Sequence, residues 1–256
     1  MNLSLLAIDV PPISHVTNWG DFGPLGLNKV AVIYGFATIM TILLFALGTG
    51  KKKPLVPTGF FQNTAESGVA FVRNQVIMQT MGTDGLGYLP YLTTLFFFIF
   101  FSNITEIIPA VQMPANARFA MPLTLAMLTW VIFNVVGVKR QGPIHYMKNS
   151  LIPPGVPAFL LILVVPIEFI STFLVRPFSL MVRLFANMLA GHLILVTFSV
   201  ITAALFAKSI TIILAPFSFG LLVAMTGFEI LVSFLQAFIF TILTAVYIGG
   251  AMHPEH

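Results

Sequence analysis

The chain has 256 residues, of which 58% are hydrophobic and only 8% are charged, and its formal net charge is +4. Soluble domains carry about 25% charged residues, so this composition excludes a soluble globular protein and indicates an integral membrane protein. The absence of cysteine excludes disulfides and thiolate metal sites, and no basic run is interleaved with aromatic residues, so we expect no nucleic-acid partner.

The N-terminal part of the chain predicts one membrane span and its orientation. Residues 1–28 lack the positive start and early apolar core of a signal peptide, so we expect them to be retained as an outer segment. The first predicted span covers residues 29–48, and three lysines follow it at 51–53. Because basic loops stay on the cytoplasmic side, the N-terminus is predicted outside and the lysines inside.

A more polar stretch follows over residues 58–82, in which apolar positions recur near helical spacing among glutamine, asparagine, Glu66 and Arg73. This pattern predicts an amphipathic helix on the inner membrane surface. The alternative is a loosely packed cytoplasmic connection.

Two further spans are predicted over residues 88–108 and 119–138, and the basic residues after the second one return the chain to the inside. The short connection between them is therefore expected outside, which makes the two spans a hairpin. Glu106 stands at the outer edge of the hairpin, where we interpret it as an interfacial charge with no mechanistic role. We interpret the glycosylation sequon at Asn103, at the end of the same span, as accidental.

The clearest internal linker is the polar, proline-rich stretch over residues 139–155. It divides the chain into an outer segment (1–28), a region with the first span, amphipathic helix and hairpin (29–138), the cytoplasmic linker itself, and a final region (156–256).

Two very long apolar segments, about 156–206 and 209–251, make up the final region. Each exceeds the roughly 20 residues that a straight span needs, so each must tilt strongly, lie partly in the membrane plane or break. Pro166, Pro177 and Pro216 are the predicted kink points. The fold class is therefore predicted as an all-α polytopic membrane protein with its C-terminus inside.

Polar and ionisable residues interrupt these two segments: Glu168, Arg176, Arg183, Asn187, His192, Glu229 and Gln236. An ionisable residue at the centre of a span costs about 2.5–3.5 kcal/mol on insertion scales, and such residues usually face a water cavity, a partner charge or an ion path. Arginine keeps its proton, so Arg183 would act as a fixed positive field. The alternative is an ion-paired structural arginine.

Helical spacing sorts these residues into two polar stripes. Asn187 follows Arg183 by four positions and shares its face, whereas His192 is nine positions on and turned about 180° away. Glu229, Ser233 and Gln236 share a face of the last segment. One stripe holds a fixed cation and the other a titratable acid with a histidine as its possible partner, which is typical of proton conduction.

The residues "RPFSLMVRLFANMLAGHLIL" and "FEILVSFLQAFIFTILTAVYI" resemble the signature of subunit a of the F-type ATP synthase membrane sector, and the likeness covers most of the chain. The resemblance implies a stator subunit with two offset half-channels, in which a fixed arginine couples proton translocation to rotation of the c-ring. By this resemblance Arg183 is the essential rotor-facing cation, and Asn187 and Gln236 are its polar neighbours.

The same resemblance assigns the remaining polar residues to the proton path. His192 and Glu229 match a pair of positions that line the outer half-channel, where family members often hold one acid and one histidine. Ser233 is added to the predicted path because helical spacing places it between Glu229 and Gln236 on the same face. Glu168 resembles the acid near the inner half-channel, although its spacing to the following "RP" is one residue longer than the pattern. Arg176 is interpreted as structural or interfacial.

The resemblance also implies partners: a c-ring with mid-membrane carboxylates, peripheral stalk subunit b, the rest of the F-type ATP synthase and membrane lipid, with no cofactor. The chain has no GxxxxGK[ST] phosphate loop, so we expect a non-catalytic subunit without a nucleotide site. The basic loops favour a bacterial plasma membrane over the mitochondrial inner membrane.

Two other functions are alternatives to this one. A stand-alone secondary transporter or ion channel would need inverted repeats or broken helices around a small-molecule site, and neither is visible in the sequence. A purely structural scaffold would not explain the titratable stripes.

Overall fold

In a computed structural model of the chain, the described residues are 29–48, 59–108, 115–152, 156–207 and 212–252, and within them all regular secondary structure is helical. The predicted outer segment 1–28, the lysines at 51–53 and most of the hairpin connection lie outside these ranges. Stretches long and apolar enough to cross a membrane number five among the described residues: Val30–Gly48, Gly82–Ile104, Ala120–Gln141, Leu161–Phe206 and Ile212–Met252. The predicted all-α polytopic fold is confirmed.

The predicted amphipathic stretch forms a nearly continuous helical run after α2 (Lys29–Gly48). It comprises α3 (Phe60–Phe71), a π-helical turn (Val72–Ile77), α4 (Met78–Thr80) and a 3-10 turn (Gly82–Tyr88). Val72, Val76 and Ile77 are fully buried, and the run packs against α2, α5 and α10. This burial argues against a loosely packed connection.

The hairpin is built from α5 (Leu89–Ile104) and α6 (Ala120–Gln141), which are joined in part by a 3-10 turn at Ala115–Ala117. Helix α5 packs against α2 on one side and α10 (Ala215–Met252) on the other, where rings of phenylalanines such as Phe96 and Phe234 meet with centroids 5.6 Å apart. Helix α6 packs against both α9 (Arg176–Ala207) and α10. The core therefore lies where α5, α6, α9 and α10 meet.

The linker is largely helical, because α7 spans Pro143–Leu151. Its prolines do not prevent this, since Pro143 stands in the first turn, where a missing N–H leaves no bond unmade. Gly142 makes the turn between α6 and α7 at φ 81°, a conformation that favours glycine. The Gln141 amide then donates to the carbonyl of Ala251 at 2.8 Å, tying this corner to the end of α10.

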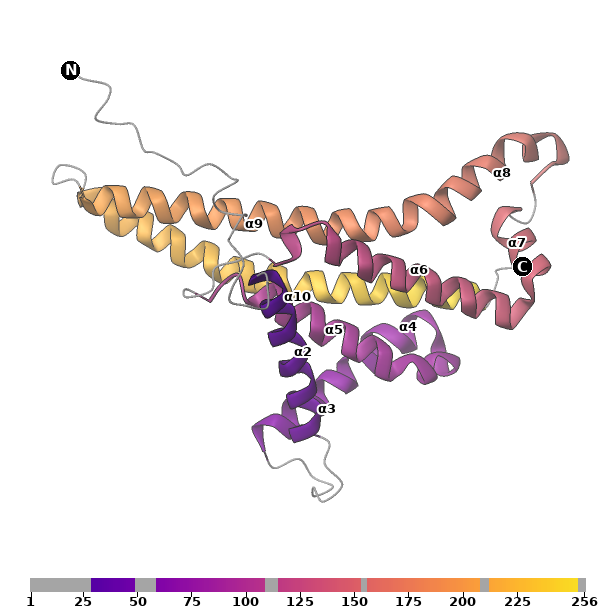
Figure 1. The fold of residues 1–256 in the computed structure, drawn as a ribbon, viewed down its shortest axis with the longest axis horizontal. Helices are drawn as coiled ribbons and strands as arrows, with labels where there is room; N and C mark the ends of the chain where they lie inside the picture. The colour runs from indigo at the N-terminus through magenta and orange to yellow at the C-terminus, as the bar shows by residue number, and fades with distance from the viewer. Residues whose placement is uncertain (1–28, 49–58, 109–114, 153–155, 208–211, 253–256) are drawn as a thin grey trace, which may run out of the picture.

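The two long segments form a hairpin of unusual length. Helix α8 (Leu161–Ile170) continues through a π-helical turn (Ser171–Val175) into α9, and Figure 1 shows α9 and α10 running side by side while α8 bends away. The bend follows Pro166 inside α8, and Pro177 lies in the first turn of α9.

The third predicted kink point is wrong. Pro216 is the second residue of α10 and opens the helix without interrupting it, because a proline in the first turn lacks only an N–H that has no partner in the helix.

Candidate functional site

Arg183 lies on α9, seven residues after the helix begins at Arg176. Its side chain is half-buried, between the fully buried Leu180 and Leu184. Among the described residues, no carboxylate lies within ion-pairing distance of the Arg183 guanidinium. A structural arginine at this depth would need a partner charge, so the structure gives no support for that alternative.

One turn further along α9, Asn187 bridges to α10. Its side-chain nitrogen donates to the Gln236 Oε1 at 2.9 Å, so the two predicted neighbours of Arg183 are in contact. Beside this bond is a small cavity with about 180 Å³ of empty space, part of it open to the surroundings. Its lining comprises Asn103, Leu184, Asn187, Met188, Glu229, Val232, Ser233 and Gln236.

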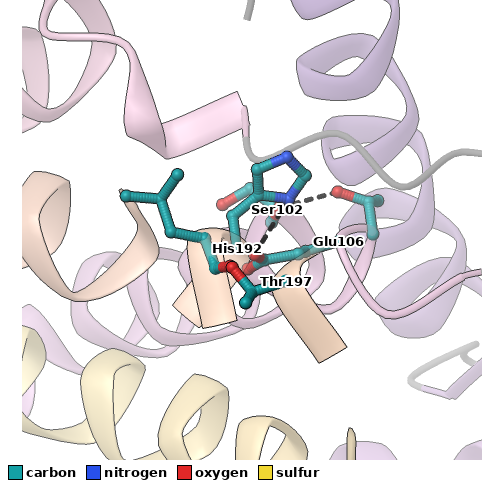
Figure 2. A network of polar contacts seen from close by, with 6 residues as sticks. Ser102, Glu106, His192 and Thr197 are labelled. Atoms are coloured by element: carbon teal, nitrogen blue, oxygen red, sulfur yellow. Dashed lines mark hydrogen bonds and ion pairs between the residues drawn. The ribbon is translucent and has the colours of Figure 1, made fainter. Parts of the chain in front are cut away.

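His192 does not pair with the acid that the sequence predicted for it. Its Nδ1 lies 3.4 Å from the Oε1 of Glu106, at the far end of α5, and both side chains are buried. Figure 2 shows the imidazole beside this carboxylate, with Ser102 next to them. The distance suits an ion pair but is longer than an ordinary hydrogen bond.

The interpretation of Glu106 as an interfacial charge is therefore wrong, since its exposed fraction is only 2%. Helix α5 ends at Ile104, and the turn that follows it places Glu106 against His192 of α9. One signal could have found it: an ionisable residue at membrane depth is a functional hypothesis by default.

Glu229 approaches α9 at a different point. A Cβ placed on Gly191 would overlap the Glu229 carboxylate, so this carboxylate packs directly onto the glycine that precedes His192. Because no larger side chain fits there, the sequence element "AGH" brings the acid of α10 against the backbone of α9. Glu106, His192 and Glu229 thus form one titratable cluster built from three segments.

Arg176 and Glu168 are less closely associated with the titratable cluster. The Arg176 guanidinium stacks over the Tyr247 ring with 5.4 Å between its Cζ and the ring centroid, a cation–π contact that fits its predicted structural role. Glu168 is half-buried on α8 and does not line the cavity beside Asn187.

Several buried polar atoms of the site have no hydrogen-bond partner among the described residues. They are both carboxylate oxygens of Glu106, Nε2 of His192, Oγ of Ser233 and Nε2 of Gln236. Buried polar groups are nearly always hydrogen-bonded, so these atoms are the ones that water or another subunit would contact.

Comparison with known proteins identifies the family of the chain. The family described as "ATP synthase A chain" matches residues 31–249. The chain is 45% identical over 255 residues to ATP synthase subunit a of Frankia alni, covering 95% of this chain and 86% of that protein.

Two other relatives bear the same name. ATP synthase subunit a of Rhodococcus erythropolis is 44% identical over 236 residues (91% of this chain, 85% of that protein), and that of Rhodopseudomonas palustris is 40% identical over 247 residues (94% and 96%). The chain therefore belongs to the ATP synthase A chain family, the family of subunit a of the membrane sector of F-type ATP synthase.

Proposed function

We propose that this chain is the stator subunit that carries the proton path of a rotary ATP synthase, with two offset half-channels separated by Arg183. One observation carries the proposal: Arg183 has no carboxylate partner in the described part of the chain, while the titratable cluster begins nine residues further along the same helix. At 1.5 Å per residue, this places His192 about 13 Å from Arg183 along the axis of α9.

The outer half-channel is assigned to the cluster of Glu106, His192 and Glu229, with Asn103 and Ser233 on its walls. The inner half-channel is assigned to the other side of Arg183, where Glu168 lies fifteen residues before it in the chain. The support for offset paths is that Glu168 and His192 stand on opposite sides of Arg183 along the continuous helical run from α8 through α9.

Arg183 then acts on a partner's carboxylate. A c-ring carboxylate must be neutral while it faces lipid, and a nearby fixed cation favours its ionised form, so the proton leaves when the carboxylate reaches Arg183. The same positive charge repels protons that would cross directly between the half-channels. The membrane potential biases the direction by about 2.3 kcal/mol per charge per 100 mV.

A test of this function is the composition of the purified complex. Affinity purification of the tagged chain in mild detergent should recover a small hairpin subunit with a mid-membrane carboxylate, a peripheral stalk subunit b and the ATP-hydrolysing subunits. Recovery of the chain alone, active in ion transport after reconstitution, would support the stand-alone transporter instead.

Orientation in the membrane can be tested by labelling, because the chain has no native cysteine. We propose an outer N-terminus and a cytoplasmic C-terminus in a bacterial plasma membrane. Two exposed positions suit single cysteines: Phe119, which directly precedes α6 and is 52% exposed, and Ile144 in α7, which is 85% exposed. These cysteines should react with an impermeant thiol reagent from opposite sides of the membrane. Labelling of both from one side would contradict the topology.

A further inference from the structure

Asn116 lies in the 3-10 turn between α5 and α6, and its side chain is fully buried. Its Oδ1 accepts a hydrogen bond from the Tyr34 hydroxyl of α2 at 2.8 Å. Its Nδ2 donates to Ser102 Oγ at 2.9 Å and to Asn103 Oδ1 at 2.5 Å, both at the end of α5. The Asn116 amide therefore joins its own turn to α2 and to the end of α5. The turn also packs against α9, the helix that carries His192 of the titratable cluster.

The direction of each bond is fixed by its neighbours. The Ser102 hydroxyl already donates to the carbonyl of Ile99 at 2.9 Å, so towards Asn116 it can only accept. Asn116 therefore uses both of its N–H groups as donors and its oxygen as the acceptor for Tyr34. The amide has a single orientation that satisfies all of these partners.

The orientation of the Asn116 amide also determines the orientation of the Asn103 amide. Because the Asn103 oxygen is held by Asn116, its –NH₂ group is the end left to donate elsewhere. Asn103 also lines the cavity that contains Glu229, Asn187 and Gln236. The fixed amide thus makes Asn103 a donor, and not an acceptor, towards the cavity that holds the Glu229 carboxylate.

We propose that Asn116 is a positioning residue of the outer half-channel: by holding the Asn103 oxygen, it presents the Asn103 –NH₂ group to the Glu229 carboxylate and so sets the pH range in which this path takes up protons. The Tyr34 hydroxyl of α2 holds the Asn116 oxygen and so helps to fix the orientation of the Asn116 amide. The inference rests on the proposed function.

Other titratable and charged groups on the helices and turns around Glu229 could also affect the pH dependence. They are Glu106 after α5, His192 and Arg183 on α9, Tyr34 on α2 and Arg118 after the 3-10 turn. Substitutions that leave all of these in place isolate the effect of the amide. Asn116→Ala and Tyr34→Phe add no charge and remove none.

The test uses the intact ATP synthase in proteoliposomes whose lumen contacts its outer face. ATP synthesis is driven by a fixed potassium diffusion potential at constant external pH, while the luminal pH is varied. In Asn116→Ala, Asn103 can turn its oxygen towards Glu229, which disfavours the charged carboxylate. We expect the midpoint at which synthesis falls to move to higher luminal pH by about one unit, with a smaller shift in the same direction for Tyr34→Phe.

Tyr91→Phe is the matched control, since this half-buried tyrosine of α5 contacts Thr129 away from the cavity. Its midpoint should equal that of the wild type. A uniform loss of rate in Asn116→Ala with an unmoved midpoint would overturn the inference. If that variant does not assemble, Tyr34→Phe decides, and an unmoved midpoint there overturns it as well.

The proposed function is tested separately in the same vesicles by Glu229→Gln. If Glu229→Gln leaves synthesis unchanged at every luminal pH, the proposed proton path itself fails. If Glu229→Gln abolishes synthesis while Asn116→Ala keeps the wild-type midpoint, only the role of Asn116 fails.

Discussion

Replacing Glu106 with glutamine is expected to slow ATP-driven proton pumping about a hundredfold, the scale of losing one positioned proton-transfer group. Glu106 and His192 are both buried, and the Glu106 Oε1 and His192 Nδ1 atoms lie 3.4 Å apart, within ion-pairing distance. Glutamine keeps the shape of the side chain but cannot take up or release a proton. The pumping rate of reconstituted complexes, normalised to the amount of assembled enzyme, measures the effect.

The structure further predicts that the two residues act as a unit. His192→Gln alone should cost about as much as Glu106→Gln, and the double variant should lose little more than either, which a double-mutant cycle detects as strong coupling. Tyr91→Phe combined with Glu106→Gln provides the control and should be additive. Additive losses for Glu106 and His192 themselves would show that their proximity has no part in proton transfer.

Replacing Arg183 with alanine should abolish coupled transport, lowering it by at least roughly a hundredfold, as for other fixed charges and donors aimed at a reacting group. The complex should still assemble, because the Arg183 side chain is only half-buried and has no ion-pair partner among the described residues. Passive proton flux through the membrane sector should rise, because the positive barrier between the half-channels is gone.

The Arg183→Lys variant tests whether a positive charge alone is sufficient or whether the shape of the guanidinium is also needed. Lysine carries a positive charge but loses its proton more readily when buried and lacks the planar fork of the guanidinium. We expect it to fail in coupled transport while keeping part of the block against leak. Passive flux, measured as decay of an imposed pH gradient without nucleotide, should rank alanine above lysine and lysine above wild type. Equal flux in all three would contradict the barrier role.

The helices could be predicted from the sequence, because the length of a hydrophobic stretch is a local property of the chain. The hairpin spans and the two long segments occur close to the predicted bounds. Pro216 was misjudged because a proline's effect depends on whether it stands inside a helix or in its first turn, and the start of α10 is not marked by composition.

The site was only partly predictable. Arg183, Asn187 and Gln236 stand out as polar residues in apolar runs, and the Asn187–Gln236 contact follows from helical spacing once α9 and α10 are paired. Glu106 and Asn116 could not be placed in this way. Both lie in or beside the hairpin connection, where no periodicity indicates a face, and their partners come from segments up to 86 residues away in the chain.

ATP synthesis by Arg183→Ala complexes under an imposed proton gradient tests the central claim most directly, with Arg140→Ala as the matched control because Arg140 is an exposed arginine at the end of α6. The account predicts wild-type synthesis in the control and none above background in Arg183→Ala, at equal amounts of assembled complex. Synthesis by Arg183→Ala near the wild-type rate would show that no fixed charge at this position is needed to couple proton flow to rotation.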